Sequence, residues 1–86
     1  MACPTITLTG VTHEVWTCVR RRVSGLGVTL PAGDSGTVRH PDVDADYAWN
    51  EQAQTLSVTF TRIPKWIGCG IIGSRVRQAA AGCGAP

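Results

Sequence analysis

The feature that most constrains the fold is the stretch from Leu56 to Ala81, in which a strand pattern gives way to a helix-like pattern. Apolar residues alternate with hydroxyl residues from Leu56 to Thr61, as a strand with one buried and one solvated face requires. The alternation ends at Pro64, and a glycine-rich apolar segment follows it. A strand that leads into a C-terminal helix predicts an α+β fold.

Further strand and helix patterns precede this stretch. Residues 12–25 carry the signals of a helix: a threonine at the N-cap, a glutamate in the first turn, arginines near the end and a glycine that terminates it. In chain order we expect a strand at 5–9, this helix, a loop at 25–36, a short strand at 37–40, an alternating strand at 43–50, a turn at 50–54, a strand at 55–63 and the C-terminal helix.

Length and composition limit the chain to one small domain. Its 86 residues are enough to bury about 60% of the surface of the unfolded chain. A hydrophobic content of 43% with 16% charged residues argues against intrinsic disorder. We therefore expect a single domain over residues 1–86 with a flexible tail at 82–86. The first helix should lie across one face of an antiparallel sheet of three or four strands, in the order β-α-β-β-β-α.

Local rules conflict only at residues 64–73. On a continuous helical wheel, Ile67 and Ile71 fall opposite the core face, and each glycine of this segment costs a helix about 1 kcal/mol. Two arrangements remain open. In one, residues 66–70 form an irregular loop, the helix begins near Ile71 and the isoleucines are buried. In the other, the helix begins earlier and leaves Trp66, Ile67 and Ile71 as an exposed apolar patch.

The aromatic residues suggest a second candidate site. Trp16 on the first helix should face Tyr47, Trp49 and Phe60 on the strands. A cavity lined by these side chains would be the default site for a small apolar ligand, although tryptophan most commonly fills the core. Trp66 is equally consistent with a core position and with surface recognition.

The four cysteines are Cys3, Cys18, Cys69 and Cys83. Their spacing matches neither an established disulfide framework nor a paired zinc-ligand motif. The N-terminus lacks a secretory signal pattern, and no apolar run is long enough to span a bilayer. We therefore expect a cytoplasmic protein with free thiols, a Cys3–Cys83 bridge being the oxidised alternative.

Three alternating acids, Asp42, Asp44 and Asp46, read like the opening of a calcium-binding loop. The rest of the loop does not fit, because Tyr47 stands where the loop needs glycine and an alanine stands where it needs glutamate. We expect a solvated strand face, or an ion pair with Arg39, and no metal or other cofactor.

The run Gly70-Ile71-Ile72-Gly73 resembles the G-x-x-G loop with which KH domains clamp a nucleic-acid backbone. The resemblance implies nucleic-acid binding, but isoleucines replace the polar inner residues of that loop. A net charge of +2 is too small to indicate such a partner by itself. A basic rim would consist of Arg62, Lys65, Arg75 and Arg77.

Whether the protein is an enzyme is left open by the sequence. Nucleophilic catalysis would pair Cys18 or Cys69 with His13 or His40. General acid–base catalysis would draw on Glu14, His40, Asp46 or Tyr47.

The leading hypothesis is a small non-enzymatic binding or assembly module. Its surface at Trp66, Ile67 and Ile71 would serve self-association into a homo-oligomer or the binding of an apolar small molecule. The first alternative is a small hydrolase or isomerase that uses the aromatic cavity. Weak nucleic-acid binding is the second alternative.

Overall fold

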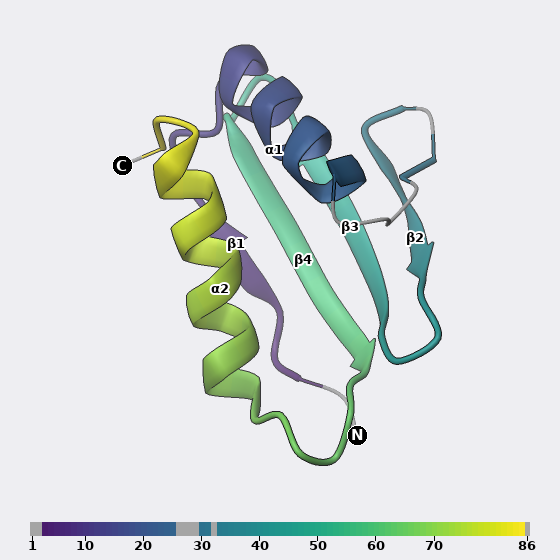
Figure 1. The fold of residues 1–86 in the computed structure, drawn as a ribbon. Coiled ribbons are helices and arrows are strands. Elements are labelled where there is room, and N and C mark those ends of the chain that lie inside the picture. The colour runs from purple at the N-terminus through teal and green to yellow at the C-terminus, as the bar shows by residue number, and fades with distance from the viewer. Residues whose placement is uncertain (1–2, 26–29, 32, 86) are drawn as a thin grey trace.

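The computed structural model describes residues 3–25, 30–31 and 33–85. They form two layers, a four-stranded antiparallel sheet and two helices that lie on one of its faces (Figure 1). The α+β class and the order β-α-β-β-β-α are confirmed. Much of the expected 25–36 loop, namely residues 26–29 and 32, lies outside the described residues. The elements are β1 (Ile6–Leu8), α1 (His13–Gly25), β2 (Ser35–Arg39), β3 (Asp44–Asn50), β4 (Thr55–Arg62) and α2 (Cys69–Gly82).

The β3–β4 hairpin is the centre of the sheet, whose strand order is β1-β4-β3-β2. Tyr47 stands opposite Val58, and Trp49 stands opposite Leu56. The aromatic residues of β3 therefore share the helix-covered face with the apolar residues of β4, as the alternation predicts. The turn between these strands includes Gln54, whose φ of 52° is in the left-handed region.

Helix α1 begins where the sequence indicates. The Val15 N–H donates to Thr12 Oγ1 at 3.3 Å, which is the contact expected of an N-cap threonine. Val15 and Trp16 are buried on the side that faces the sheet. The helix is therefore held by its apolar face, and its acidic first turn and basic last turn suit the helix dipole.

The core lies between the helices and the sheet. Val11, in the segment between β1 and α1, is fully buried. The Trp49 indole N–H donates to the Val11 carbonyl oxygen at 2.8 Å and thereby satisfies a buried polar group. Strand residues on the opposite face are mostly threonine, serine and aspartate, so that face needs no cover. The buried cluster consists of Ile6, Leu8, Val11, Val15, Trp16, Tyr47, Trp49, Leu56 and Ala80.

The expectation of free thiols is wrong, and so is the Cys3–Cys83 alternative. Cys3 is bonded to Cys69, and Cys18 is bonded to Cys83, with Cα separations of 5.5 and 5.7 Å. The partners are 66 and 65 positions apart in the chain. Spacing cannot reveal such pairs, because only the packing of α2 against β1 and α1 brings them together.

The two disulfides hold α2 at both ends. The N-cap residue of α2 is Gly68, which has no side chain that could cap the helix. The two buried residues of α2 are Gly73 and Ala80. Such small side chains bury little apolar surface. The flexible tail expected at 82–86 is described as far as residue 85, and there the Ala85 N–H donates to the Ala80 carbonyl oxygen at 3.0 Å. Covalent attachment is therefore a main reason why α2 stays on the sheet.

Reduction of the disulfides should strongly destabilise the fold. A bridge that closes a loop of about 65 residues restricts the unfolded chain by about 4 kcal/mol in the chain-entropy model. The double variant Cys18→Ala/Cys83→Ala should therefore lower the free energy of unfolding by about 2–5 kcal/mol in guanidinium titrations. The matching variant Cys3→Ala/Cys69→Ala provides the comparison. An unfolding midpoint that does not respond to dithiothreitol would contradict this role.

Candidate functional site

The structure separates the residues predicted as a site into two groups. Trp16, Tyr47 and Trp49 meet between α1 and the sheet. Trp66 and Ile71 lie at the junction of β4 and α2. The two groups differ in exposure, and this difference decides which of them can meet a partner.

The aromatic group is part of the core. The Trp16 ring centroid lies 5.5 Å from that of Tyr47 and 5.9 Å from that of Trp49, and all three side chains are buried. The Tyr47 hydroxyl donates to the Pro31 carbonyl oxygen at 3.1 Å. Phe60 is half-buried and packs against this cluster. These side chains fill the space between helix and sheet, which is the more common role of tryptophan.

Replacement of Trp49 tests this core role. Trp49→Phe removes the donor to the Val11 carbonyl oxygen and leaves that buried acceptor without it, whereas Trp16→Phe removes a similar ring volume without that loss. We expect Trp49→Phe to be less stable than Trp16→Phe by about 1–3 kcal/mol in chemical unfolding. Equal midpoints for the two variants would show that the hydrogen bond adds nothing to the packing of the ring.

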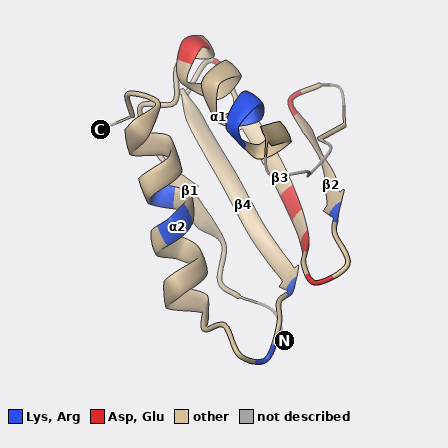
Figure 2. Ribbon diagram, in the orientation of Figure 1, with Lys and Arg blue, Asp and Glu red and all other residues tan. Residues whose placement is uncertain are grey.

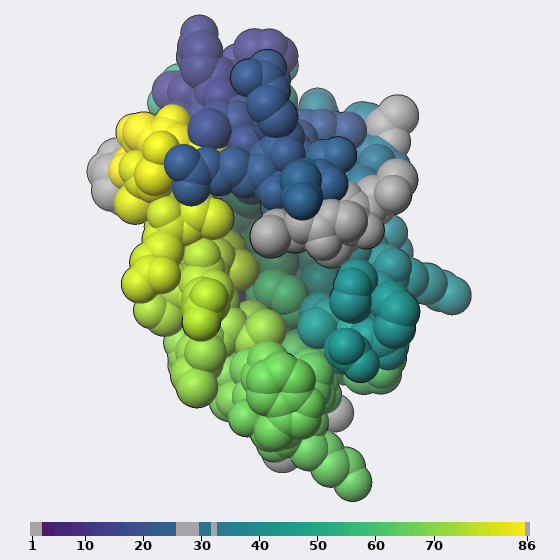
Figure 3. Space-filling view, viewed as in Figure 1, coloured from purple at the N-terminus to yellow at the C-terminus, as the bar shows by residue number. Residues whose placement is uncertain are grey.

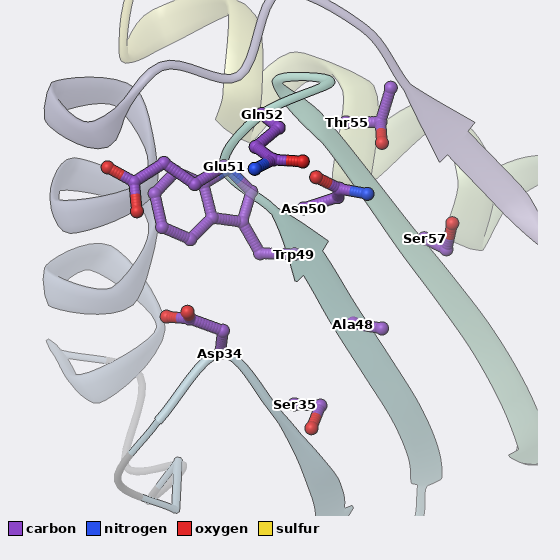
Figure 4. Close-up of a pocket in the computed structure, with 9 residues that line it drawn as sticks. All are labelled: Asp34, Ser35, Ala48, Trp49, Asn50, Glu51, Gln52, Thr55 and Ser57. Atoms are coloured by element: carbon purple, nitrogen blue, oxygen red, sulfur yellow. The ribbon is translucent and has the colours of Figure 1, made fainter.

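A shallow depression of about 570 Å³ lies where β2 stops short of the end of β3 (Figure 4). No motif of the sequence indicates this depression, because its side chains come from three separate segments. It is open to solvent and most of the residues that line it are polar, and no described side chain in it is both buried and without a hydrogen-bond partner. Its lining is Asp34, Ser35, Ala48, Trp49, Asn50, Glu51, Gln52, Thr55 and Ser57.

The junction between β4 and α2 carries the exposed apolar residues. Trp66 is 79% exposed and Ile71 is 57% exposed, and they are the only exposed large apolar side chains among the described residues. Ile67 is half-buried, and its N–H donates to the Pro64 carbonyl oxygen at 3.1 Å, which closes a turn before the helix. We call Trp66, Ile67 and Ile71 the apolar corner.

The apolar corner combines the two arrangements that the sequence left open. Residues 63–68 are an irregular connection, as the first arrangement predicts, and α2 then begins at Cys69. Ile71, however, points to solvent, as the second predicts, so the burial of both isoleucines is wrong. The reason is the helix start: with Cys69 bonded to Cys3 on the inner side, Ile71 is turned outward and Ile72 is half-buried.

Basic residues precede and follow the apolar corner in the chain. Lys65, Arg75 and Arg77 are exposed, and none forms an ion pair with another described residue. Figure 2 shows these basic positions on α2 and in the connection before it, whereas the acidic positions lie on α1, on β3 and in the connections next to β2 and β3. In the space-filling view, the green connection between β4 and α2 forms the end of the molecule away from α1 (Figure 3).

Of the three alternating acids, Asp44 and Asp46 lie on β3, and Asp42 lies in the connection before it. Asp44 accepts a hydrogen bond from the Arg62 Nε–H at 3.0 Å, so its ion-pair partner is Arg62. Arg39, the partner suggested by the sequence, only stands opposite Asp44 in the β2–β3 register. Asp46 accepts a hydrogen bond from the Thr37 hydroxyl at 2.7 Å. Within the described ranges, no three His, Cys, Asp or Glu residues are grouped so that they could hold a metal ion.

The pKa of Asp44 is lowered mainly by its hydrogen bond from Arg62. Desolvation opposes this shift, and the positive charges of Arg62 and Arg39 add to it. Since the folded pKa is below the unfolded value of about 3.9, the pair contributes stability above that pH and loses it as the pH falls through the folded pKa. The contribution is small because the pair is exposed to solvent.

Arg62→Gln should return the pKa of Asp44 toward its ordinary value. Arg39→Gln is the matched control, because it removes the same charge without the hydrogen bond, and it should raise that pKa less. The carboxyl carbon shift of Asp44 followed by NMR across acidic pH measures both effects. If the two variants give equal titration curves, the hydrogen bond is not the main cause of the shift.

The residues considered for catalysis are not brought together. Cys18 and Cys69 are both oxidised, so neither supplies the thiolate that a nucleophilic mechanism requires. His13 packs beside Trp49 at the start of α1, with a ring-centroid distance of 6.1 Å. His40 lies in the connection between β2 and β3, where its Nδ1 accepts the Asp42 N–H at 3.4 Å. The thiol-based mechanism is therefore excluded for the oxidised protein.

The G-x-x-G run is helical and does not form a loop. Gly70 to Gly73 lie in the first turns of α2, and the N–H groups of Ile71 and Ile72 donate to the Gly68 carbonyl oxygen. Their donors therefore serve the helix start and are not free for a phosphate. The resemblance to KH domains does not extend to the structure.

Comparisons with protein families, with curated proteins and with solved structures find no match to this chain. Over the described residues, neither helix has the length and apolar character needed to cross a bilayer. A fold alone does not define an activity, so function must be argued from the residues of the site.

Proposed function

We propose that this protein is a non-enzymatic binding module whose contact surface is the apolar corner. The observation that carries the proposal is the 79% exposure of Trp66, because tryptophan is strongly enriched at recognition surfaces and is costly to leave in water. Ile71 adds a second exposed apolar side chain at the same junction. Together they form the kind of surface that a partner covers.

A rigid frame supports this role. Cys69 lies between Trp66 and Ile71 in the chain, and its bond to Cys3 ties the junction to the N-terminal segment. The Cys3 N–H donates in turn to the Phe60 carbonyl oxygen at 2.9 Å, which links that segment to β4. A surface held in place before binding loses less conformational entropy when it meets a partner.

The hydrolase or isomerase alternative has less support. Its cysteines are oxidised, and the aromatic side chains that would line its cavity are packed in the core. We also propose an oxidising compartment, in place of the cytoplasm expected from the sequence, because cytosolic glutathione and thioredoxin keep most thiols reduced.

Substitutions at the apolar corner test the proposed function. Trp66→Ala and Ile71→Ala should reduce the fluorescence of a bound apolar dye and weaken any self-association seen by sedimentation velocity at micromolar concentration. Their free energies of unfolding should stay within about 0.5 kcal/mol of the unsubstituted protein, because both side chains are exposed.

Arg21→Ala is the matched control, since it shortens an exposed side chain on α1, away from the apolar corner (Figure 1). It should leave dye binding and sedimentation unchanged. The proposal is lost if the protein is a strict monomer whose solubility and dye binding do not change in Trp66→Ala.

A further inference from the structure

We propose that the apolar corner docks on the surface of an anionic phospholipid bilayer. This inference rests on the proposed function and names the partner of the same surface. It concerns contact with the lipid interface, where side chains enter to the depth of the headgroups and no helix spans the bilayer.

The apolar side chains suit a lipid interface. Trp66 projects from the connection between β4 and α2, and tryptophan prefers the zone where lipid headgroups meet acyl chains. Ile71 follows in the first turn of α2 and supplies a purely aliphatic group. The two come from one junction, so a single orientation of the protein can present both.

The basic side chains are placed to contact headgroups at the same time. Lys65 is the neighbour of Trp66 in the chain, and Arg75 lies one helical turn after Ile71 on the exposed side of α2. Long basic side chains can extend their charges to phosphates while their stems lie along apolar groups. Each such charge near an anionic bilayer strengthens binding about fivefold.

The distribution of charge along the chain favours this orientation. Residues 52–86 contain four basic residues and no acidic residue, a charge of +4. Residues 1–51 contain four basic and six acidic residues, a charge of −2, which accounts for the total of +2. Among the four basic residues, only Arg62 is neutralised by an ion pair within the described part of the chain. The part of the chain that carries the apolar corner therefore also carries an excess of positive charge.

The same charges argue against the other partners. In a two-fold dimer through the apolar corner, the basic residues of both copies would face each other, which is unfavourable. A nucleic acid would satisfy the charges and could stack on Trp66, but it offers no apolar phase to the aliphatic side chain of Ile71. An anionic bilayer satisfies both the charges and the apolar groups.

Binding to vesicles of defined composition tests the inference. The oxidised protein is mixed with vesicles of phosphatidylcholine containing phosphatidylserine, and with vesicles of phosphatidylcholine alone, and bound protein is measured by co-sedimentation. We expect binding to the anionic vesicles that weakens as salt is added. Trp66 emission should shift to the blue on binding, while the buried Trp16 and Trp49 should contribute little change.

Variants identify the surface that makes the contact. Trp66→Ala should abolish the emission shift, and Lys65→Gln and Arg75→Gln should each weaken vesicle binding about fivefold. Arg21→Gln removes the same charge from α1 and should leave binding unchanged. Equal binding to both kinds of vesicle, or an equal loss in Arg21→Gln, overturns the inference.

The remaining outcomes separate this inference from the proposed function. A dimer that depends on Trp66, without vesicle binding, overturns the lipid partner and leaves the binding module intact. Retention on short RNA or DNA that depends on Trp66 does the same and points to a nucleic-acid partner. A strict monomer that binds neither vesicles nor nucleic acid, with dye binding unchanged in Trp66→Ala, overturns both proposals.

Discussion

The attachment of α2 to the rest of the fold depends on two covalent bonds. The helix has no side-chain N-cap, and its fully buried residues are a glycine and an alanine, so apart from the partly buried Val76 it adds little apolar surface to the core. Cys3–Cys69 fastens its first turn, and Cys18–Cys83 fastens the residue after its last. With α2 in place, Ala80 completes the core cluster of α1 and the sheet. A small domain that buries a modest core commonly relies on such bridges.

The same bonds decide what the surface presents. Because Cys69 faces inward, Ile71 faces solvent, and the short connection from β4 leaves Trp66 exposed just before the helix. If α2 were held only by its apolar side chains, the hydrophobic effect would favour the burial of Ile67 and Ile71. A helix positioned by disulfides can instead keep an apolar residue outside. Local sequence rules conflict at this junction, and such conflicts tend to fall at functional sites.

The three tryptophans show how residues of one type acquire different roles. Trp16 and Trp49 lie on elements whose periodicity directs them into the core, and the indole of Trp49 finds a backbone acceptor there. Trp66 lies in an irregular connection, where no helix or strand periodicity predicts the direction of a side chain, and its side chain is exposed to solvent. The sequence could thus predict the core aromatic residues with a mechanism, while the exposure of Trp66 remained an open alternative.

Interactions between near neighbours in the chain could be read from the sequence alone. One is the Thr12 cap of α1, and another is the alternation that places Tyr47 and Trp49 on the inner face of the sheet. The order of these local patterns also predicted the α+β class. Only the tertiary structure decided the cysteine pairing, the partner of Asp44 and the outward direction of Ile71. The physical reason is range: periodicity and capping act over a few residues, whereas the disulfides join cysteines 65 and 66 positions apart that meet only when α2 has docked.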